Sequence, residues 1–399
     1  MKISKNILLA QYTTFKIGGP ARFFCAVADE KELVEAVKFA KEKSLRIFVL
    51  GGGSNILVSD DGFSGLVIKN EMKGVGGGNN FYFKTDEEAG NALGGGNSID
   101  NESIAAAAGE IWDDLVKYTV ERNLAGIENL SGIPGTVGAA PVQNIGAYGT
   151  DAAQTIETVR VLDLNSMKFK ELTNKECEFG YRDSIFKKQK GRYIVTAVSF
   201  RLKKGGRANI DYADLQEYFG RKQARNPMPK TAKLPIFNPK RSSADGSGGA
   251  IAGIHAAAGG FDEPLKFEPS IVDVRDAVVE IRRNKLPDWT HWGTAGSYFK
   301  NPVVDEAKCR ELTNKFPGIV CFRESAGMHK FSLGWIIDKI CHMKGVTVGN
   351  VGTHDRQALV LIAKPGASAK EVVALSENIM RRVREETGLE IEMEVEWVN

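Results

Sequence analysis

Apolar residues recur at helical spacing in some segments of the chain and alternate with polar residues in others. Near the start these patterns predict a strand at 22–27, a helix whose N-cap is Asp29, and a second strand at 47–50. A third strand is expected at 66–69. This order of elements predicts a small α/β unit that presents backbone amides where its strands end.

The middle of the chain is predicted to be richer in strands. Strands rich in Val and Ile are expected at 156–164 and 193–202, and a helix at 111–123. The glycine- and asparagine-rich stretches within 74–97 predict exposed hairpin loops around a short strand at 81–83.

The second half of the chain begins with a segment, 219–269, whose prolines, serines and glycines predict a linker or surface insertion. Beyond it the apolar spacing predicts helices, the last of which has a capping box from Ser368 to Glu371 and ends at Gly388. A final strand at 389–398 alternates apolar residues with glutamates, so one face is acidic. The helices are expected at 272–283, 305–316, 331–343 and 368–388.

Composition limits the possible partners. The 399 residues predict two or three domains, and a net charge of +3 without a basic, aromatic stripe argues against nucleic acid. Five scattered cysteines without a CxxC pair predict buried thiols, no metal site and a reducing, cytoplasmic location. No apolar run is long enough for a signal peptide or a membrane span, and no obligate protein partner is implied.

The segment 126–149 holds too much glycine, alanine and proline for an ordinary helix or strand, and it carries almost no charge. Because glycine lacks a Cβ atom and tolerates positive φ, the amides of 131–140 can approach a ligand closely. A flat, polyanionic cofactor suits such a loop, and the simpler alternative is a long structural loop. A second glycine-rich turn, 51–55, follows the strand at 47–50 and alone is as well explained as a tight turn. Together the two segments predict a pair of phosphate-binding loops.

Four motifs occur in the order of one known family. They are Asn-Leu-Ser-Gly-Ile-Pro-Gly-Thr-Val-Gly at 129–138, Gln-Asn-Ile-Gly-Ala-Tyr-Gly at 143–149, Phe-Gly-Tyr-Arg-Asp-Ser at 179–184, and Gly-Ser-Tyr-Phe-Lys-Asn-Pro at 296–302. The chain therefore resembles the bacterial UDP-N-acetylenolpyruvoylglucosamine reductases, also called UDP-N-acetylmuramate dehydrogenases, of the longer subtype with a tyrosine loop.

The resemblance implies an α+β fold with a two-part FAD-binding domain of the vanillyl-alcohol-oxidase type and a C-terminal α/β substrate-binding domain. The first FAD-binding part would span 1–69 with the strand 389–399, the second 70–215, the insertion or linker 216–270, and the substrate-binding domain 271–388. FAD would contact the two loops through Gly51, Gly52, Gly53, Ser54, Asn55, Ser131, Ile133, Gly135, Thr136, Gly138, Ala139, Gly146, Ala147 and Tyr148.

The same resemblance implies reduction, with NADPH, of the enolpyruvyl ether of UDP-N-acetylglucosamine. Hydride addition leaves a carbanion that the neighbouring carboxylate can spread as an enolate. By similarity, Arg182 and Glu394 would stabilise that charge and Ser297 would donate the proton, with Lys300 or a water as relay. Substrate contacts would come from Tyr181, Tyr212, Lys285, Asn301, Lys344 and Gln357.

The C-terminal strand departs from the family pattern. Its Met393 takes the place of a proline and Glu396 that of an arginine, so Glu392 stays open as an alternative to Glu394. The insertion after Tyr212 is a second departure. Two other functions stay open as alternatives, an FAD oxidase of a small substrate and a nucleotide-sugar-binding protein without turnover.

Overall fold

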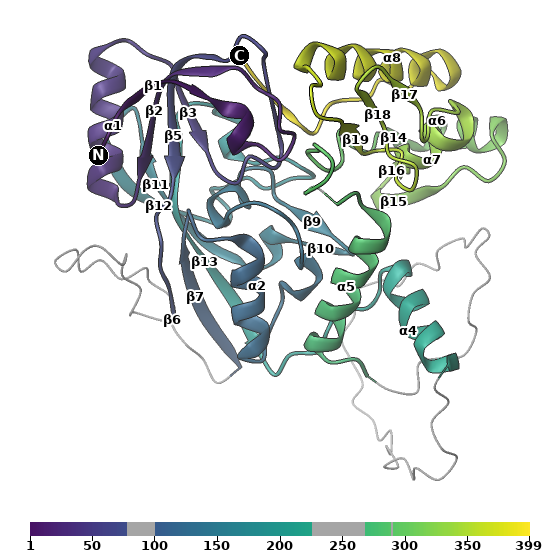
Figure 1. The fold of residues 1–399 in the computed structure, drawn as a ribbon. Helices are drawn as coiled ribbons and strands as arrows, with labels where there is room; N and C mark the ends of the chain where they lie inside the picture. The colour runs from purple at the N-terminus through teal and green to yellow at the C-terminus, as the bar shows by residue number, and fades with distance from the viewer. Residues whose placement is uncertain (78–99, 226–267, 289) are drawn as a thin grey trace.

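The computed structural model describes residues 1–77, 100–225, 268–288 and 290–399 (Figure 1). The first sheet has the order β1-β2-β5-β3, from β1 (Ser4–Leu8), β2 (Pro20–Val27), β5 (Phe63–Asn70) and β3 (Ile47–Leu50). β2 and β3 both run parallel to β5, which is consistent with the small α/β unit predicted from the order of elements. The predictions missed β1 and the three-residue β4 (Ile56–Val58).

Helix α1 (Glu30–Glu42) covers this first sheet (Figure 1). The Asp29 carboxylate accepts a hydrogen bond from the Glu32 amide, so the predicted N-cap is confirmed. Leu33 and Val37 are fully buried on the sheet side of the helix.

A larger antiparallel sheet follows, with the order β12-β11-β13-β7-β6. The long β13 (Tyr193–Lys204) lies at its centre and also pairs with β8 (Leu124–Ala125). The residues 75–77, expected in an exposed loop, form β6, half-buried beside β7; the expected strand at 81–83 lies outside the described residues. The other elements are β12 (Lys168–Thr173), β11 (Ile156–Asp163), β7 (Asn101–Ala107), β6 (Val75–Gly77), the pair β9 (Gly146–Ala147) and β10 (Thr150–Asp151), α2 (Trp112–Glu121) and α3 (Ile185–Lys188).

Helices α4 (Ala213–Arg225) and α5 (Ile271–Lys285) lie side by side (Figure 1), and α5 packs against the start of the glycine-rich segment at Glu128–Leu130. Leu215 and Phe219 of α4 pack against Val274 and Val278 of α5, and all four side chains are buried. The predicted start of the linker at Phe219 is therefore wrong, because the apolar side chains of this segment continue the helix to Arg225. The rest of that segment up to residue 267 lies outside the described residues.

The C-terminal part consists of two small sheets enclosed by helices, with orders β14-β16-β15 and β17-β18-β19. The last helix α8 has the predicted capping box from Ser368 to Glu371, and Gly388 ends it in the left-handed conformation at φ 69°. The elements are β14 (Val303–Asp305), α6 (Glu306–Lys315), β15 (Cys321–Ser325), β16 (Met328–Phe331), α7 (Leu333–Trp335) continuing into a π-helical turn (Ile336–Ile340), β17 (Thr347–Val348), β18 (Val351–Thr353), β19 (Leu361–Ala363) and α8 (Ala369–Thr387).

The chain then returns to its N-terminal part, where β20 (Glu396–Val398) pairs in parallel with β4. The predicted strand at 389–398 is thus confirmed only for its last three residues. Before them the chain crosses as irregular backbone, with one bridge between Met393 and Phe299. Within the described residues, no helix combines the length and the apolar character needed to cross a bilayer.

Candidate active site

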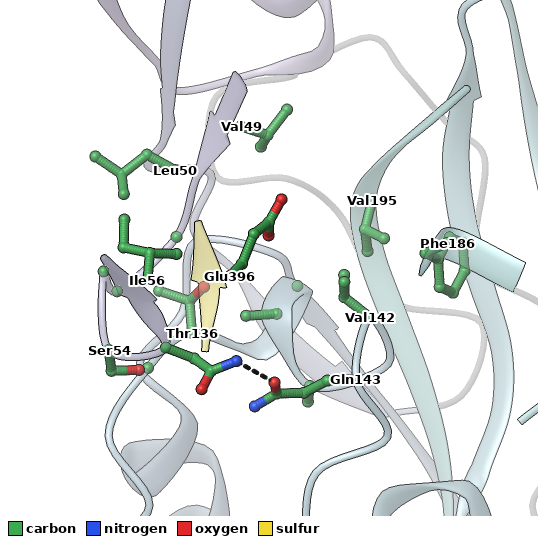
Figure 2. A pocket seen from close by; sticks show the side chains of 18 of the residues that line it. Val49, Leu50, Ser54, Ile56, Thr136, Val142, Gln143, Phe186, Val195 and Glu396 are labelled. Atoms are coloured by element: carbon green, nitrogen blue, oxygen red, sulfur yellow. Dashed lines mark hydrogen bonds between the residues drawn. The ribbon is translucent and has the colours of Figure 1, made fainter. Parts of the chain in front are cut away.

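A cavity of about 480 Å³ lies where the two glycine loops meet the returning C-terminal segment (Figure 2). Its apolar wall includes Val49 of β3, Val142 of the segment 126–149, and Val195 of β13. Across from this wall the Asn55 amide group donates to the Gln143 side chain and, at 3.1 Å, to the Glu394 carbonyl. The cavity is therefore apolar on one side and rich in amide groups on the other.

The turn 51–55 presents its backbone to the cavity. None of the five amides from Gly51 to Asn55 donates a hydrogen bond to another described residue, and neither does the amide of Gly135. Five consecutive unpartnered donors match the needs of a pyrophosphate, which accepts many hydrogen bonds and carries negative charge. The cavity thus fits the FAD expected from the sequence, with the amides for its pyrophosphate and the apolar wall for a flat ring.

The two loops approach so closely that only glycine fits. A Cβ atom on Gly52 would lie 2.5 Å from the Gly135 Cα atom, and one on Gly53, where φ is +64°, would lie 2.0 Å from the Tyr12 carbonyl oxygen. Such distances leave no room for a side chain. Gly52 is therefore required by the contact between the two loops, and Gly53 by the contact of its turn with Tyr12.

Ten of the fourteen expected cofactor contacts line this cavity: Gly51, Gly52, Gly53, Ser54, Asn55, Ile133, Gly135, Thr136, Gly138 and Ala139. The other four, Ser131, Gly146, Ala147 and Tyr148, are outside its lining. Ser131 is fully buried, donates to the Glu128 carbonyl and accepts from Arg275 at 3.0 Å. Its contacts are those of a residue that holds the loop in shape.

Arg182 and Glu394 meet at the edge of the cavity. The Arg182 Nε atom lies 2.9 Å from a Glu394 carboxylate oxygen, and both side chains are largely buried. Arg182 also donates to the Gly146 carbonyl at 2.5 Å, and its own backbone adopts φ +54°. Gly146, expected as a cofactor contact but outside the cavity lining, therefore positions the catalytic candidate Arg182.

Burial raises the pKa of Glu394, and the nearby charges of Arg182 and Lys187 offset this only in part. The alternative Glu392 is different, since its exposed carboxylate pairs with Lys300 at 2.8 Å. Of the two glutamates, Glu394 is the one beside Arg182 and on the cavity.

Ser297 lies one residue from the backbone contact that fixes Glu394. The Glu394 amide donates to the Tyr298 carbonyl at 2.8 Å, and Ser297 itself forms a bridge with Val360. The Ser297 hydroxyl makes no hydrogen bond to another described residue. The structure therefore places Ser297 next to the backbone contact of Glu394, while Ser297 and Arg182 are both outside the residues that line the cavity.

Lys187 and Lys300 also line the cavity, and burial lowers the pKa of Lys187. Lys187 donates to the Arg182 carbonyl at 3.0 Å. Sequence analysis missed Lys187 because it lies on the four-residue helix α3, where two adjacent lysines look like ordinary surface charges. It also missed Gln143 as a contact, although the motif at 143–149 contains it.

The six expected substrate contacts fall into separate groups. The Tyr181 hydroxyl accepts a hydrogen bond from the backbone N–H of Asn301 at 3.4 Å, and Tyr181 is the neighbour of Arg182 in the chain. Tyr212 packs its ring edge-on against Tyr148, with 5.5 Å between the ring centroids, and Lys285 pairs with Asp214 at 2.6 Å.

The remaining two contacts are on the C-terminal part. Lys344 pairs with Asp338 at 2.5 Å, and Gln357 follows Arg356, which donates to the Asn284 carbonyl at the end of α5 at 2.7 Å. Sequence analysis missed Arg282 of α5, which donates to the Gly132 carbonyl at 3.1 Å and so joins this helix to the glycine loop.

Comparisons with known proteins match both parts of the chain. An FAD binding domain family matches residues 21–167, and the C-terminal domain of UDP-N-acetylenolpyruvoylglucosamine reductase matches residues 288–398. The chain therefore contains an FAD-binding domain, and FAD as the cofactor is confirmed.

Similar proteins cover nearly the whole chain. UDP-N-acetylenolpyruvoylglucosamine reductases of Neisseria gonorrhoeae and Paraburkholderia xenovorans are 38% and 36% identical over 98% and 97% of this chain, and over 96% and 95% of their own lengths. The crystal structure of the Thermus caldophilus enzyme covers all of both chains with a TM-score of 0.59 at 23% identity. The expected two-part fold is confirmed.

Proposed function

Since the chain belongs to the UDP-N-acetylenolpyruvoylglucosamine reductase family, we propose that it reduces the enolpyruvyl ether of UDP-N-acetylglucosamine to UDP-N-acetylmuramate. NADPH would be the reductant and peptidoglycan precursor synthesis the pathway. The observation that carries the proposal is the buried pair of Arg182 and Glu394 beside a cavity with unpartnered amides. The pair suits a small carboxylate-bearing substrate next to a flavin.

FAD would be held by the amides of the turn 51–55 and by the loop around Gly135, and when reduced it supplies a hydride. The glycines keep both loops close enough for the amides to converge. The apolar wall would exclude water from the reacting side of the ring.

Arg182 and Glu394 would stabilise the enolate that forms on the substrate's enolpyruvyl group. The Arg182 guanidinium offers several N–H donors, and binding of a second anion would favour the protonated form of Glu394 further. Because its pKa is already raised, Glu394 is disposed to donate a hydrogen bond to the substrate carboxylate rather than repel it. These two residues would therefore act most strongly as negative charge develops.

Ser297 would deliver the proton to the carbanion carbon. A serine hydroxyl is a weak acid, so proton transfer needs a neighbour that replaces the lost proton. Lys300, three residues further on, lines the cavity, whereas Ser297 itself does not, and Lys300 is the candidate relay, directly or through a water. The Lys300 ammonium forms an ion pair with the Glu392 carboxylate at 2.8 Å.

The nucleotide part of the substrate would bind between α4, α5 and the C-terminal sheets. Tyr181 and Asn301 would contact the sugar beside Arg182, and Tyr212 the uridine side. Lys285 and Lys344 would exchange their present carboxylate partners for the diphosphate, whose two charges make it the stronger partner. Gln357 completes this set.

The domain boundaries expected from the sequence are proposed here with one change. The FAD-binding parts would be 1–69 with 389–399 and 70–215, and the substrate-binding domain 271–388; the connection expected at 216–270 would begin only after α4, which ends at Arg225. The cytoplasm, where nucleotide sugars and NADPH are found, is the expected location.

The proposal is tested by adding NADPH and the enolpyruvyl nucleotide sugar to purified protein and following the nicotinamide absorbance. Oxidation that depends on the nucleotide sugar is expected. Oxidation with dioxygen alone as acceptor would favour the alternative of an FAD oxidase. Tight binding of the nucleotide sugar without any turnover would favour a binding protein, and a preparation that takes up no FAD would contradict both enzyme proposals.

A further inference from the structure

Two cysteines and a histidine meet in the C-terminal part, on the far side of β16 from the candidate active site. Cys309 is on helix α6, Cys321 on β15 and His329 on β16. Their ligand atoms all lie within 4.8 Å of one another, and among the described residues no other group of this kind occurs. The sequence predicted no metal site, because Cys309 and Cys321 are too far apart for a CxxC motif.

The fold explains why these three side chains converge. In the antiparallel pair β15–β16, Cys321 is opposite Phe331 and Arg323 is opposite His329. Cys321 and His329 are therefore diagonal neighbours on the same face of the sheet, within reach of each other. Helix α6 packs on that face and brings Cys309 against Cys321, with 3.1 Å between the two sulfur atoms.

A fourth residue, Glu306, contacts the ring of His329. The His329 Nε2 atom lies 2.5 Å from a carboxylate oxygen of Glu306, which is on α6 one turn before Cys309. When Nε2 carries the proton and donates it to this carboxylate, Nδ1 holds the free lone pair. A carboxylate that orients a histidine in this way is typical of histidines that bind a metal ion.

We propose that Cys309, Cys321 and His329 form a binding site for Zn²⁺. Two thiolates and one imidazole are ligands that zinc prefers, and three protein ligands leave one position for water. On binding, each cysteine releases its thiol proton to solvent while the imidazole binds as the neutral base. Zn–S bonds of ~2.3 Å in tetrahedral geometry place two sulfurs ~3.8 Å apart, so the cysteines must separate by ~0.7 Å.

The site would connect three elements of the C-terminal part. α6, β15 and β16 each contribute one ligand, so bound zinc would fasten the helix to the sheet. The residue after His329 is Lys330, whose ammonium lies 4.7 Å from the centre of the Tyr181 ring. Zinc binding would thus stabilise β16, whose Lys330 contacts the Tyr181 ring, without a direct contact to the candidate active site.

The test measures zinc in the FAD-bound protein, purified with a phosphine reductant that keeps thiols reduced. Metal analysis after dialysis should find one zinc per chain, and competition with a chromogenic chelator gives the affinity. Cys309→Ser, Cys321→Ser and His329→Asn should each lose the bound zinc. Glu306→Gln should weaken binding by about 10- to 100-fold, the effect typical of a residue that orients a ligand.

Matched controls are a cysteine and a histidine of the same region outside the cluster. Cys341→Ser and His342→Asn should bind zinc as the unaltered protein does. Cobalt in place of zinc should give thiolate charge-transfer bands that disappear in Cys309→Ser and Cys321→Ser. If a variant fails to fold, the cobalt spectrum of the unaltered protein still tests the proposal.

Three outcomes would overturn the proposal. The first is a protein that retains no zinc and shows no thiolate-cobalt bands. The second is zinc binding that is equal in the cluster variants and in the controls. The third is a Cys309–Cys321 disulfide, found by mass spectrometry in the reduced preparation, which would identify the cysteines as a redox pair.

Discussion

Replacement of Gly53 by alanine should weaken FAD binding far more than it affects folding. The new Cβ atom would lie 2.0 Å from the Tyr12 carbonyl oxygen, whereas a carbon–oxygen contact needs about 3.3 Å or more. The turn must therefore move by more than ~1 Å. It cannot slide freely, because the Gly53 carbonyl accepts from the Thr14 amide at 3.0 Å.

The size of the effect follows from the amides that this turn presents. Displacing one amide by about 1 Å breaks its hydrogen bond, and a bond to a charged acceptor contributes about 1.5–3 kcal/mol. One lost bond to the pyrophosphate thus weakens FAD binding by roughly 10- to 150-fold. The dissociation constant is measured by titrating FAD into apoprotein and following the quenching of flavin fluorescence.

Gly366→Ala is the matched control. Gly366 also has a positive φ, +88°, but a Cβ atom there would meet no described atom within 4 Å. Both substitutions therefore carry the same left-handed strain of about 1–2 kcal/mol, measured by urea unfolding of the apoproteins. If Gly53→Ala binds FAD as tightly as Gly366→Ala does, the turn 51–55 does not hold the cofactor.

Three further predictions concern the reaction and the stability. Ser297→Ala should leave the reduction of the flavin by NADPH intact but slow its reoxidation by the enolpyruvyl substrate by ~10²–10⁴-fold, measured for each step by stopped-flow absorbance. Equal slowing of both steps would contradict a role of Ser297 in proton transfer. Glu394→Gln should raise the urea midpoint at neutral pH. The pKa of Glu394 is raised in the folded state, so the wild-type protein loses free energy of unfolding as the pH rises above the ordinary value of 4.5, and a neutral glutamine avoids that loss. The gain should shrink on acidification, and a pH-independent decrease of the midpoint would refute the prediction. Asp60→Ala should lower the free energy of unfolding by about 1 kcal/mol, because the Asp60 carboxylate accepts a hydrogen bond from the backbone amide of Ala369 in the first turn of α8 at 2.7 Å. Asp61→Ala, at an exposed neighbouring position, should have no such effect.

Local patterns predicted α1, α2, α5, α6 and α8, but they missed α3 and α4, and the helix expected at 331–343 is a short α7 followed by a π-helical turn. Asp29 before α1, and Ser368 with Glu371 before α8, identify helix starts through contacts within four residues, and the structure has each of them. Such contacts depend on nothing further along the chain. The glycine loops were predicted for a similar reason, because the content of glycine, alanine and proline in 126–149 already argues against an ordinary helix or strand.

The partners of the last segment could not be predicted in this way. Alternation correctly predicted that Leu389, Ile391 and Val395 are buried, but burial does not require a strand. Met393, expected inside, is 41% exposed, because the backbone turns there to place Glu394 beside Arg182. That turn depends on a partner more than 200 residues earlier, which no local pattern contains.

The same limit explains Lys187 and the cluster of Cys309, Cys321 and His329. Each residue is ordinary in its own segment and becomes distinctive only when the fold places it beside another. Lys187 becomes a cavity residue through the position of α3, and the cysteines meet only because α6 packs on β15 and β16.

The pairing of β20 with β4 bears on how the protein is made. Asn55 is separated by 339 residues from Glu394, whose carbonyl it binds, and β20 lies further still along the chain. On a ribosome that adds about 5–20 residues per second, roughly 20–70 seconds pass between their syntheses. Throughout that interval β4 is without the strand that it pairs with in the structure, and the cavity lacks its C-terminal lining from Met393 to Glu396. We therefore expect FAD to bind after the last residues have been made, and we expect a chain cut short before residue 396 to lack part of this lining.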